Sequence, residues 1–176
     1  HMTFVFHSQT TYRSIFNSLR YAASSTAVDV LIGCAIAWLV VRQKIPGRQM
    51  LDSLAVLPLA VPGLILAAGY VALTVKGSPF EAIGPTRNPF FILVIAYSVR
   101  RLPFVVRGVT AGLQQIPDSL EEAARNLGAT GTRTILRITI PLVLPSIIAA
   151  TVLTFSFAIL EVSDSLILAQ VQSDYP

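Results

Sequence analysis

Long uninterrupted apolar blocks constrain this chain more than any other feature. Residues 22–41 contain one charged side chain, Asp29, and residues 54–75 and 138–160 contain none. At 1.5 Å per residue, about 20 helical residues cross the roughly 30 Å hydrocarbon core of a bilayer. Each block is therefore long enough to cross a membrane, and a helix is the form that satisfies its backbone in lipid. We predict three membrane spans at these positions.

The composition supports the same interpretation and excludes several classes of protein. Charged residues make up 12% of the chain, against about a quarter in a soluble domain. The net charge is +4, but the basic residues lie between the apolar blocks, which is typical of a protein in membrane lipid and not of one that binds nucleic acid. Cys34 and His7 are the only informative cysteine and histidine, so we expect no disulfide, metal or cofactor. No P-loop motif is present, so any ATP would be bound by another chain.

A fourth, weaker block lies at residues 89–106. Only 11 uncharged residues, 89–99, precede Arg100 and Arg101, a length typical of either a short span or a buried or re-entrant segment. The block reaches full length if both arginines extend toward the cytoplasmic interface. We therefore predict an all-α fold, a polytopic helix bundle forming one membrane domain over residues 3–176.

Charge counting gives the orientation of the bundle. With four spans, nine basic residues lie on one side and four on the other, and the richer side should be cytoplasmic. If residues 89–106 do not cross, the split becomes ten against three and residues 42–50 become external. Both alternatives place the loop at residues 107–137 in the cytoplasm.

This loop contains a short amphipathic helix at residues 118–128. Ser119 is the expected N-cap, Glu122 would complete a capping box, and Gly128 supplies a helix stop. Small side chains in its apolar stripe would let the backbone of another protein come close. The stripe consists of Leu120, Ala123, Ala124 and Leu127.

The spacing from Glu122 onward resembles the EAA motif of permeases of binding-protein-dependent ABC importers. Glu122-Ala123-Ala124 is followed by Gly128 and then by Ile138-x-Ile140-Pro141. The family pattern has leucine at position 140 and often an aromatic residue near Thr132. The resemblance covers residues 14–170, including the proline motifs at 57–63 and 102–104.

The resemblance implies the type I importer permease fold, in the bacterial inner membrane. It implies that the loop docks on a cytoplasmic ABC ATPase, so the chain itself is no enzyme. The other implied partners are a periplasmic or extracellular solute-binding protein and a second permease half or copy. The chain would be a fragment, with a further helix after residue 176. The cargo would be a small solute, and residues 161–165 resemble permeases for ferric iron or phosphonates. The residues implied in ATPase coupling are Leu120, Glu122, Ala123, Ala124, Leu127 and Gly128.

Three acidic residues are candidates for the translocation path. Asp29 lies within the first block, and Glu161 and Asp164 end the last block, spaced to share a helix face. The alternative is that Asp29 bonds to a nearby hydroxyl, of Ser25 or Thr26, and that the other two form a solvated helix end.

Two glycines, Gly108 and Gly112, are spaced four residues apart in the loop at residues 107–137. Their spacing predicts flexibility or a close helix crossing.

Two other classes of function are alternatives to a permease. A membrane-embedded enzyme would require clustered polar residues at one depth, and a scaffold subunit that does not transport would have no ATPase partner.

Overall fold

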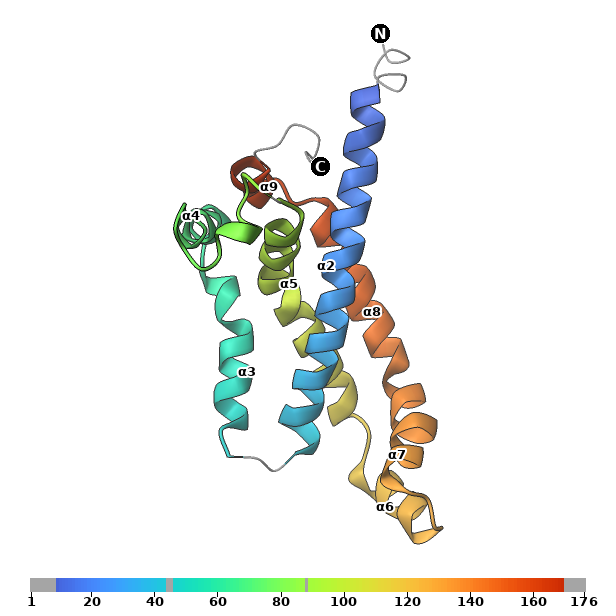
Figure 1. Cartoon of the computed structure of the whole chain (residues 1–176). Coiled ribbons are helices and arrows are strands. Elements are labelled where there is room, and N and C mark those ends of the chain that lie inside the picture. The colour runs from blue at the N-terminus through green and yellow to red at the C-terminus, as the bar shows by residue number, and fades with distance from the viewer. Residues whose placement is uncertain (1–8, 44–45, 88, 170–176) are drawn as a thin grey trace.

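The computed structural model describes residues 9–43, 46–87 and 89–169. Within these ranges the chain is built from helices and contains no strand, which confirms the all-α prediction. The helices form an elongated bundle, with the N-terminal helix projecting beyond the others at one end (Figure 1).

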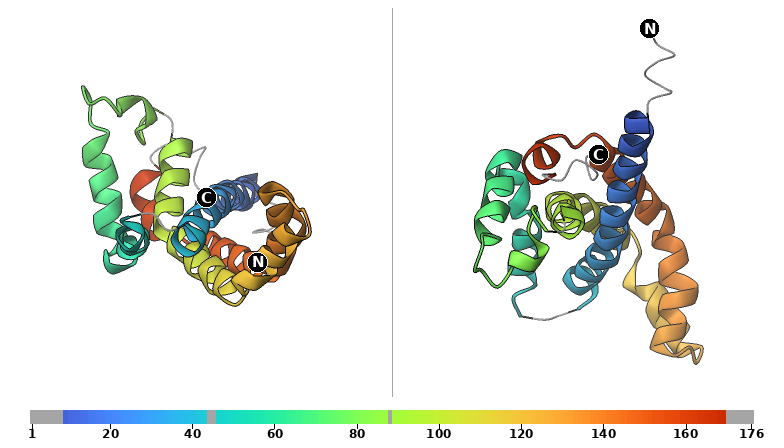
Figure 2. Two further views of the ribbon diagram at one scale, coloured as in Figure 1. Left: turned by 90° about the horizontal axis from the view of Figure 1, so that it is seen from below. Right: turned by 45° about the horizontal axis from the view of Figure 1, so that its top comes forward.

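Three helices pack against one another and form the centre of the bundle. They are α2 (Gln9–Arg42), α5 (Pro89–Gln114) and α8 (Ile140–Ile159), and each contacts the other two. One apolar cluster joins them toward each end, around Tyr97 and around Val109. Figure 2 shows that the helices between α2 and α5 lie to one side of this group.

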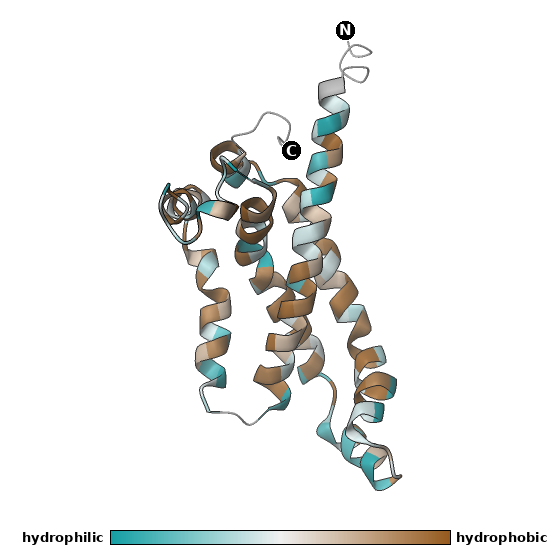
Figure 3. Cartoon of the chain, viewed as in Figure 1, coloured by the Kyte–Doolittle hydropathy of each residue, from teal (hydrophilic) through white to brown (hydrophobic). Residues whose placement is uncertain are grey.

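The membrane-length helices match three of the four predicted spans. Residues Thr11–Arg42, Pro89–Gln114 and Gly131–Ile159 are each long and apolar enough to cross a bilayer, and hydrophobic residues predominate along the second and third of these helices (Figure 3). The block at 89–106 is therefore a full-length helix. It continues to Gln114, so the predicted loop at 107–137 begins inside α5.

The block at 54–75 is not the continuous helix that the sequence predicts. It is divided into α3 (Arg48–Val56), the 3-10 turn η1 (Leu57–Ala60) and α4 (Gly63–Leu73). The two halves meet at 104° and could together make a fourth, broken span or a re-entrant segment. Pro58 and Pro62 are the cause: each lacks a backbone N–H and clashes with the preceding turn, so a helix ends or begins at such a residue.

The ends of the bundle decide between the two predicted topologies. The end of α2 and the beginning of α3 lie at the same end of the bundle as α6 (Asp118–Asn126), and the end of α4 and the beginning of α5 lie at the other end (Figure 1). Arg42, at the end of α2, forms ion pairs with both Asp118 and Glu121 of α6. Residues 42–50 and 107–137 therefore share one side, as the four-block topology requires, and the alternative with an external 42–50 is wrong.

Close crossings between the central helices depend on three glycines. A Cβ on Gly33 of α2 would lie 2.7 Å from Val105 Cγ1, and a Cβ on Gly108 of α5 would lie 2.9 Å from Ala150 Cβ. A Cβ on Gly112 would lie 2.6 Å from Ser146 Cβ. The spacing of Gly108 and Gly112 thus marks a close helix crossing, between α5 and α8, as the sequence predicts.

Candidate functional site

The first turn of α6 differs from the predicted capping box. The helix begins at Asp118, its N-cap is Pro117, and no side chain caps it. The extended backbone of Pro117 starts the helix two residues before the expected position, so Ser119 lies inside the first turn. Instead of a cap, Asp118 and Glu121 place negative charge in the first turn, where the helix dipole favours it.

The other end of α6 is built as the sequence predicts. Gly128 adopts a left-handed conformation with φ 86°. Its N–H donates to Arg125 O at 2.9 Å, and the N–H of Ala129 donates to Ala124 O at 3.0 Å. These two bonds form a Schellman motif, which ends the helix and turns the chain sharply.

The apolar stripe of α6 is mostly open to the surroundings. Ala124 is buried against the rest of the chain, whereas Ala123 is exposed. Leu120 is 44% exposed and Leu127 is 89% exposed. Because Glu122 and Gly128 are also exposed, five of the six residues implied in coupling are directly available to a partner protein, on α6 or in the turn that follows it.

Glu121 is the functional residue that sequence reasoning missed. Its side chain is buried, although it is the neighbour of the exposed Glu122. It pairs with Arg42 of α2 and Arg125 of α6, and it accepts a hydrogen bond from Thr139, at the start of the last span. The only sequence signal is the pair of adjacent glutamates, which necessarily face different directions on a helix.

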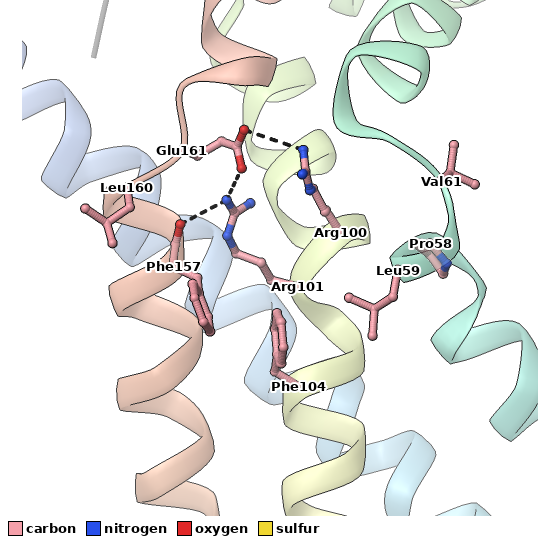
Figure 4. A pocket seen from close by; sticks show the side chains of 9 residues that line it. All are labelled: Pro58, Leu59, Val61, Arg100, Arg101, Phe104, Phe157, Leu160 and Glu161. Carbon is pink, nitrogen blue, oxygen red and sulfur yellow. Dashed lines mark hydrogen bonds and ion pairs between the residues drawn. The ribbon is translucent and has the colours of Figure 1, made fainter.

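A second group of charges lies near the other end of the bundle. Arg101 of α5 forms an ion pair with Glu161 and donates to Phe157 O at 3.0 Å (Figure 4). Arg100 Nη1 lies 3.5 Å from Glu161 Oε1 and 3.9 Å from Asp164 Oδ1. Arg101 is only 3% exposed. The two arginines therefore do not extend to the cytoplasmic interface, because carboxylates from the end of the last span hold them inside the bundle.

Glu161 and Asp164 also differ from their predicted arrangement. Glu161 lies in the break between α8 and α9 (Ser163–Leu168), so the two acids do not share one helix face. Glu161 Oε1 accepts the backbone N–H groups of Ser163 and Asp164, at 2.9 and 3.3 Å. Asp164 is 1% exposed, which excludes a solvated helix end.

A cavity of about 280 Å³ adjoins these charges. It lies between the break in the second block, the middle of α5 and the end of α8 (Figure 4). Its wall combines apolar side chains with three charged ones. The lining residues are Pro58, Leu59, Val61, Arg100, Arg101, Phe104, Phe157, Leu160 and Glu161.

Asp29 lies at the centre of the helix bundle. Its side chain is completely buried, and neither carboxylate oxygen has a hydrogen-bond partner. Ser25 bonds instead to Ala22 O, and the Thr26 hydroxyl has no partner. The predicted alternative, a bond from Asp29 to Ser25 or Thr26, is therefore wrong.

Metal-ligating side chains do not gather in the part of the chain that the structure describes. No group of three or more His, Cys, Asp or Glu residues there could hold an ion. Cys34, the one cysteine, is a free thiol on α2.

The two outer carboxyls have opposite pKa shifts. Burial and then the neighbouring Glu161 charge raise the pKa of Asp164 to about 6, although Arg100 and Arg101 partly oppose this. Burial alone would also raise the pKa of Glu161, but the two arginines and a backbone N–H outweigh burial and hold that pKa below its ordinary value. Glu161 is thus the carboxylate that neutralises the arginines, and Asp164 is the group that accepts a proton first.

Asp164 predicts a pH effect on stability. The folded chain binds a proton at higher pH than the unfolded chain, so the free energy of unfolding should increase as the pH falls through about 6. Glu161 acts in the opposite direction, but only as the pH falls below its ordinary value of 4.5. Thermal unfolding in detergent at about pH 7 and about pH 5 should show the increase, and the increase should be smaller in Asp164→Asn. An equal increase in the Asn variant would contradict this assignment.

These features define a multi-pass membrane protein with an exposed helix at one end of its bundle. The chain belongs to the family of binding-protein-dependent transport system inner membrane components, whose family model matches residues 29–170. It is 34% identical to the molybdenum transport system permease protein ModB of Escherichia coli K12, over 82% of this chain and 66% of that protein. It is 33% identical to the ferric transport system permease protein FbpB of Actinobacillus pleuropneumoniae, over 85% of this chain but 21% of that protein.

Another relative and two solved structures extend the comparison. The probable sulfate transport system permease protein cysT of Chlorokybus atmophyticus is 37% identical over 86% of this chain and 55% of that protein. A bacterial transporter that imports the polysaccharide alginate has the same fold, with a TM-score of 0.79, 20% identity and coverage of 99% of this chain and 66% of that one. The MetNI methionine ABC transporter gives a TM-score of 0.70 at 21% identity, covering 90% of this chain and 74% of that one.

The comparisons place the chain in the inner membrane and favour a transport subunit. The family description and the names of the relatives are those of permeases, not of membrane enzymes or scaffolds. The chain spans two thirds or less of each of these three relatives, so it corresponds to a part of their length.

Proposed function

We propose that this chain is the membrane-spanning permease part of an ABC importer and that α6 docks on a separate cytoplasmic ATPase. One observation carries the proposal: α6 ends in a Schellman turn at Gly128 and leaves Leu120, Ala123, Leu127 and Glu122 exposed. A short helix with apolar anchors and one outward charge is suited to a groove on another protein. Ala124 contributes from the inner side of the same helix by holding it against the bundle.

The remaining partners follow from the same proposal. They are a solute-binding protein on the outer side and a second permease half or copy beside the bundle. In support, one structural neighbour is an alginate transporter in complex with its periplasmic protein. The apolar outer surfaces of α2 and α8 (Figure 3) offer area for lipid and for a second permease unit.

The translocation path is proposed to pass the outer charged cluster. The cavity beside Arg100, Arg101 and Glu161 lies at the break of the second block, where a change in the angle between α3 and α4 would open or close it. Asp29 and Asp164 extend the same group of charges into the bundle and into α9. The cargo is a small solute. Ferric iron is one candidate, since the relatives bear names for ferric, molybdenum and sulfate transport.

Cysteine labelling tests the proposed orientation. In a full-length transporter whose Cys34 is replaced by alanine, cysteines are placed at Asn126 of α6 and at Thr86 in the loop before α5, both exposed positions. An impermeant thiol reagent added to intact cells should modify the cysteine at 86 and not the cysteine at 126. Disruption of the membrane should then expose the second site. Modification of the cysteine at 126 in intact cells would refute the cytoplasmic placement of α6.

A pull-down tests the function itself. The tagged full-length protein should co-purify with an ABC ATPase, and uptake of the cargo should require both chains. A protein that reaches the membrane normally and binds no ATPase would refute the proposal and favour a scaffold.

A further inference from the structure

The buried face of α6 makes polar contacts with the rest of the chain, and docking of α6 on a partner protein does not explain them. Glu121 has only 9% of its side chain exposed, and a buried carboxylate is costly unless cations and hydrogen bonds compensate it. Arg42 Nε lies 3.1 Å from Glu121 Oε1, and the Thr139 hydroxyl donates to the same oxygen at 3.1 Å. These two groups come from outside α6, whereas Arg125, whose Nη2 lies 3.7 Å from Glu121 Oε2, belongs to α6 itself.

The two partners of Glu121 lie at the cytoplasmic ends of two different spans. Arg42 is the last residue of α2, and Thr139 is the residue before α8. The three residues are separated by 79 and 18 positions in the chain, yet they meet at one carboxylate oxygen. Glu121 is therefore a point at which α6 is tied to the first and the last long helix of the bundle.

Arg42 holds the beginning of α6 at two further positions. Its Nη2 donates to Ile116 O at 3.0 Å, and its Nη1 pairs with Asp118. The guanidinium thus spans the turn that leads into α6 and its first helical residues. A rigid fork of donors is suited to such a role, because it fixes orientation as well as distance.

The segment that carries Thr139 has an unusual helical form. Residues Ile135–Thr139 form a π-helix between α7 (Gly131–Thr134) and α8. Such a segment is a local widening of the helix, and these segments are frequent at functional sites. Here the widening lies between the loop that leaves α6 and the membrane helix that follows it, where a change in helical register would be transmitted along α8.

We infer that Arg42, Glu121 and Thr139 form a joint that passes movement of α6 to α2 and α8. The inference rests on the proposed docking of α6 on an ATPase and assigns different roles to two adjacent glutamates. Glu122 faces the partner, whereas Glu121 faces the permease and acts as a positioning residue. Without the joint, α6 still binds the ATPase, but its displacement no longer moves both spans together.

The test separates docking from transmission in the full-length transporter, reconstituted with its ATPase and binding protein. Arg42→Gln and Glu121→Gln are compared with Arg48→Gln. Arg48 begins α3 at the same end, is exposed, and pairs with no acidic side chain among the described residues. ATPase co-purification, ATP hydrolysis and solute uptake are each measured. We expect both joint variants to keep the ATPase bound and to lower uptake per ATP hydrolysed about tenfold, whereas Arg48→Gln leaves that ratio unchanged.

Two further comparisons distinguish a joint from a merely structural contact. The effect of the Arg42→Gln/Glu121→Gln double variant should fall short of the product of the two single effects, because both variants remove the Arg42–Glu121 contact. Thr139→Val should lower the ratio of uptake to hydrolysis, and Thr139→Ser, which keeps the hydroxyl, should restore it. These threonine variants decide the question if the charge variants do not accumulate.

Three outcomes would overturn the inference, and a fourth would refute the proposed function instead. Normal uptake per ATP in all the joint variants would overturn the inference. So would a parallel loss of abundance, ATPase binding and uptake in Thr139→Val, or fully multiplicative effects in the double variant. Failure of the unmodified protein to bind any ATPase would instead refute the proposed function on which the joint depends.

Discussion

Gly112→Val should prevent the folded protein from accumulating in the membrane. A Cβ at this position would lie 2.6 Å from Ser146 Cβ and 3.0 Å from Val143 Cγ2, so α5 and α8 could not keep their present separation. Overpacking of a core costs about 1–3 kcal/mol. Ser146 and Val143 both lie on α8, and α8 cannot move away from α5 without disturbing the contact between Gly108 and Ala150. In a membrane, close packing of small residues is a main force that joins helices, so the loss extends to the whole crossing.

Gly69→Val is the matched control for this variant. Gly69 also lies within a helix, α4, and a Cβ there would meet nothing within 4 Å. Membrane abundance and the midpoint of thermal unfolding in detergent should be close to normal for the control and strongly reduced for Gly112→Val. Equal abundance and equal midpoints in the two variants would show that the α5–α8 crossing is not close in the folded protein.

Hydropathy predicts the long helices because the hydropathy of a segment depends only on residues that are neighbours in the sequence. The block at 89–106 illustrates both its value and its limit. Its eleven uncharged residues left a full-length span in doubt, because Arg100 and Arg101 count as polar wherever they lie. In the structure they are compensated by Glu161 and Asp164, some sixty residues away, and such a pairing has no local signal.

The bend in the second block shows another limit. Both halves are apolar, so a hydropathy profile cannot distinguish a straight span from two helices at 104°. The local signal is the pair Pro58 and Pro62, which disfavour a continuous helix but do not specify the angle between the two halves. The side chain of Arg100 lies so close to Gly63 that a Cβ there would overlap it, so packing against α5 also favours the broken form.

The candidate site on α6 also combines features that local sequence predicts with features that it does not. The stop at Gly128 was predictable, because a left-handed glycine after an amphipathic turn is a local pattern. The helix starts two residues before the cap that the sequence predicts, since Pro117 can begin a helix without a side-chain cap. The burial of Glu121 has no local signal in the sequence. The cation that compensates it is Arg42, at the end of α2, and the hydroxyl that donates to it belongs to Thr139, at the start of the last span.

Gly128→Val and Glu122→Lys should both abolish most solute uptake while the protein still inserts normally. Gly128 has φ 86°, and a residue with a Cβ pays about 1–2 kcal/mol in that conformation. The chain would escape the strain by redirecting the turn after Leu127, which displaces the exposed surface of α6 as a unit. Glu122 is exposed and forms no cap, so its replacement by lysine changes only the charge offered to the ATPase.

Gly131→Val provides the comparison for the glycine variant. Gly131 has an ordinary φ and begins α7, and a Cβ at this position would meet nothing within 4 Å, so uptake should remain near normal. Uptake, membrane abundance and ATPase co-purification are measured together in the full-length transporter. We expect Gly128→Val and Glu122→Lys to lower uptake and ATPase association by at least about tenfold, the equivalent of roughly 1.4 kcal/mol of docking free energy, at unchanged abundance. Normal uptake in both variants would show that α6 does not couple the two proteins, and a collapse of abundance would show that the loop serves the fold instead.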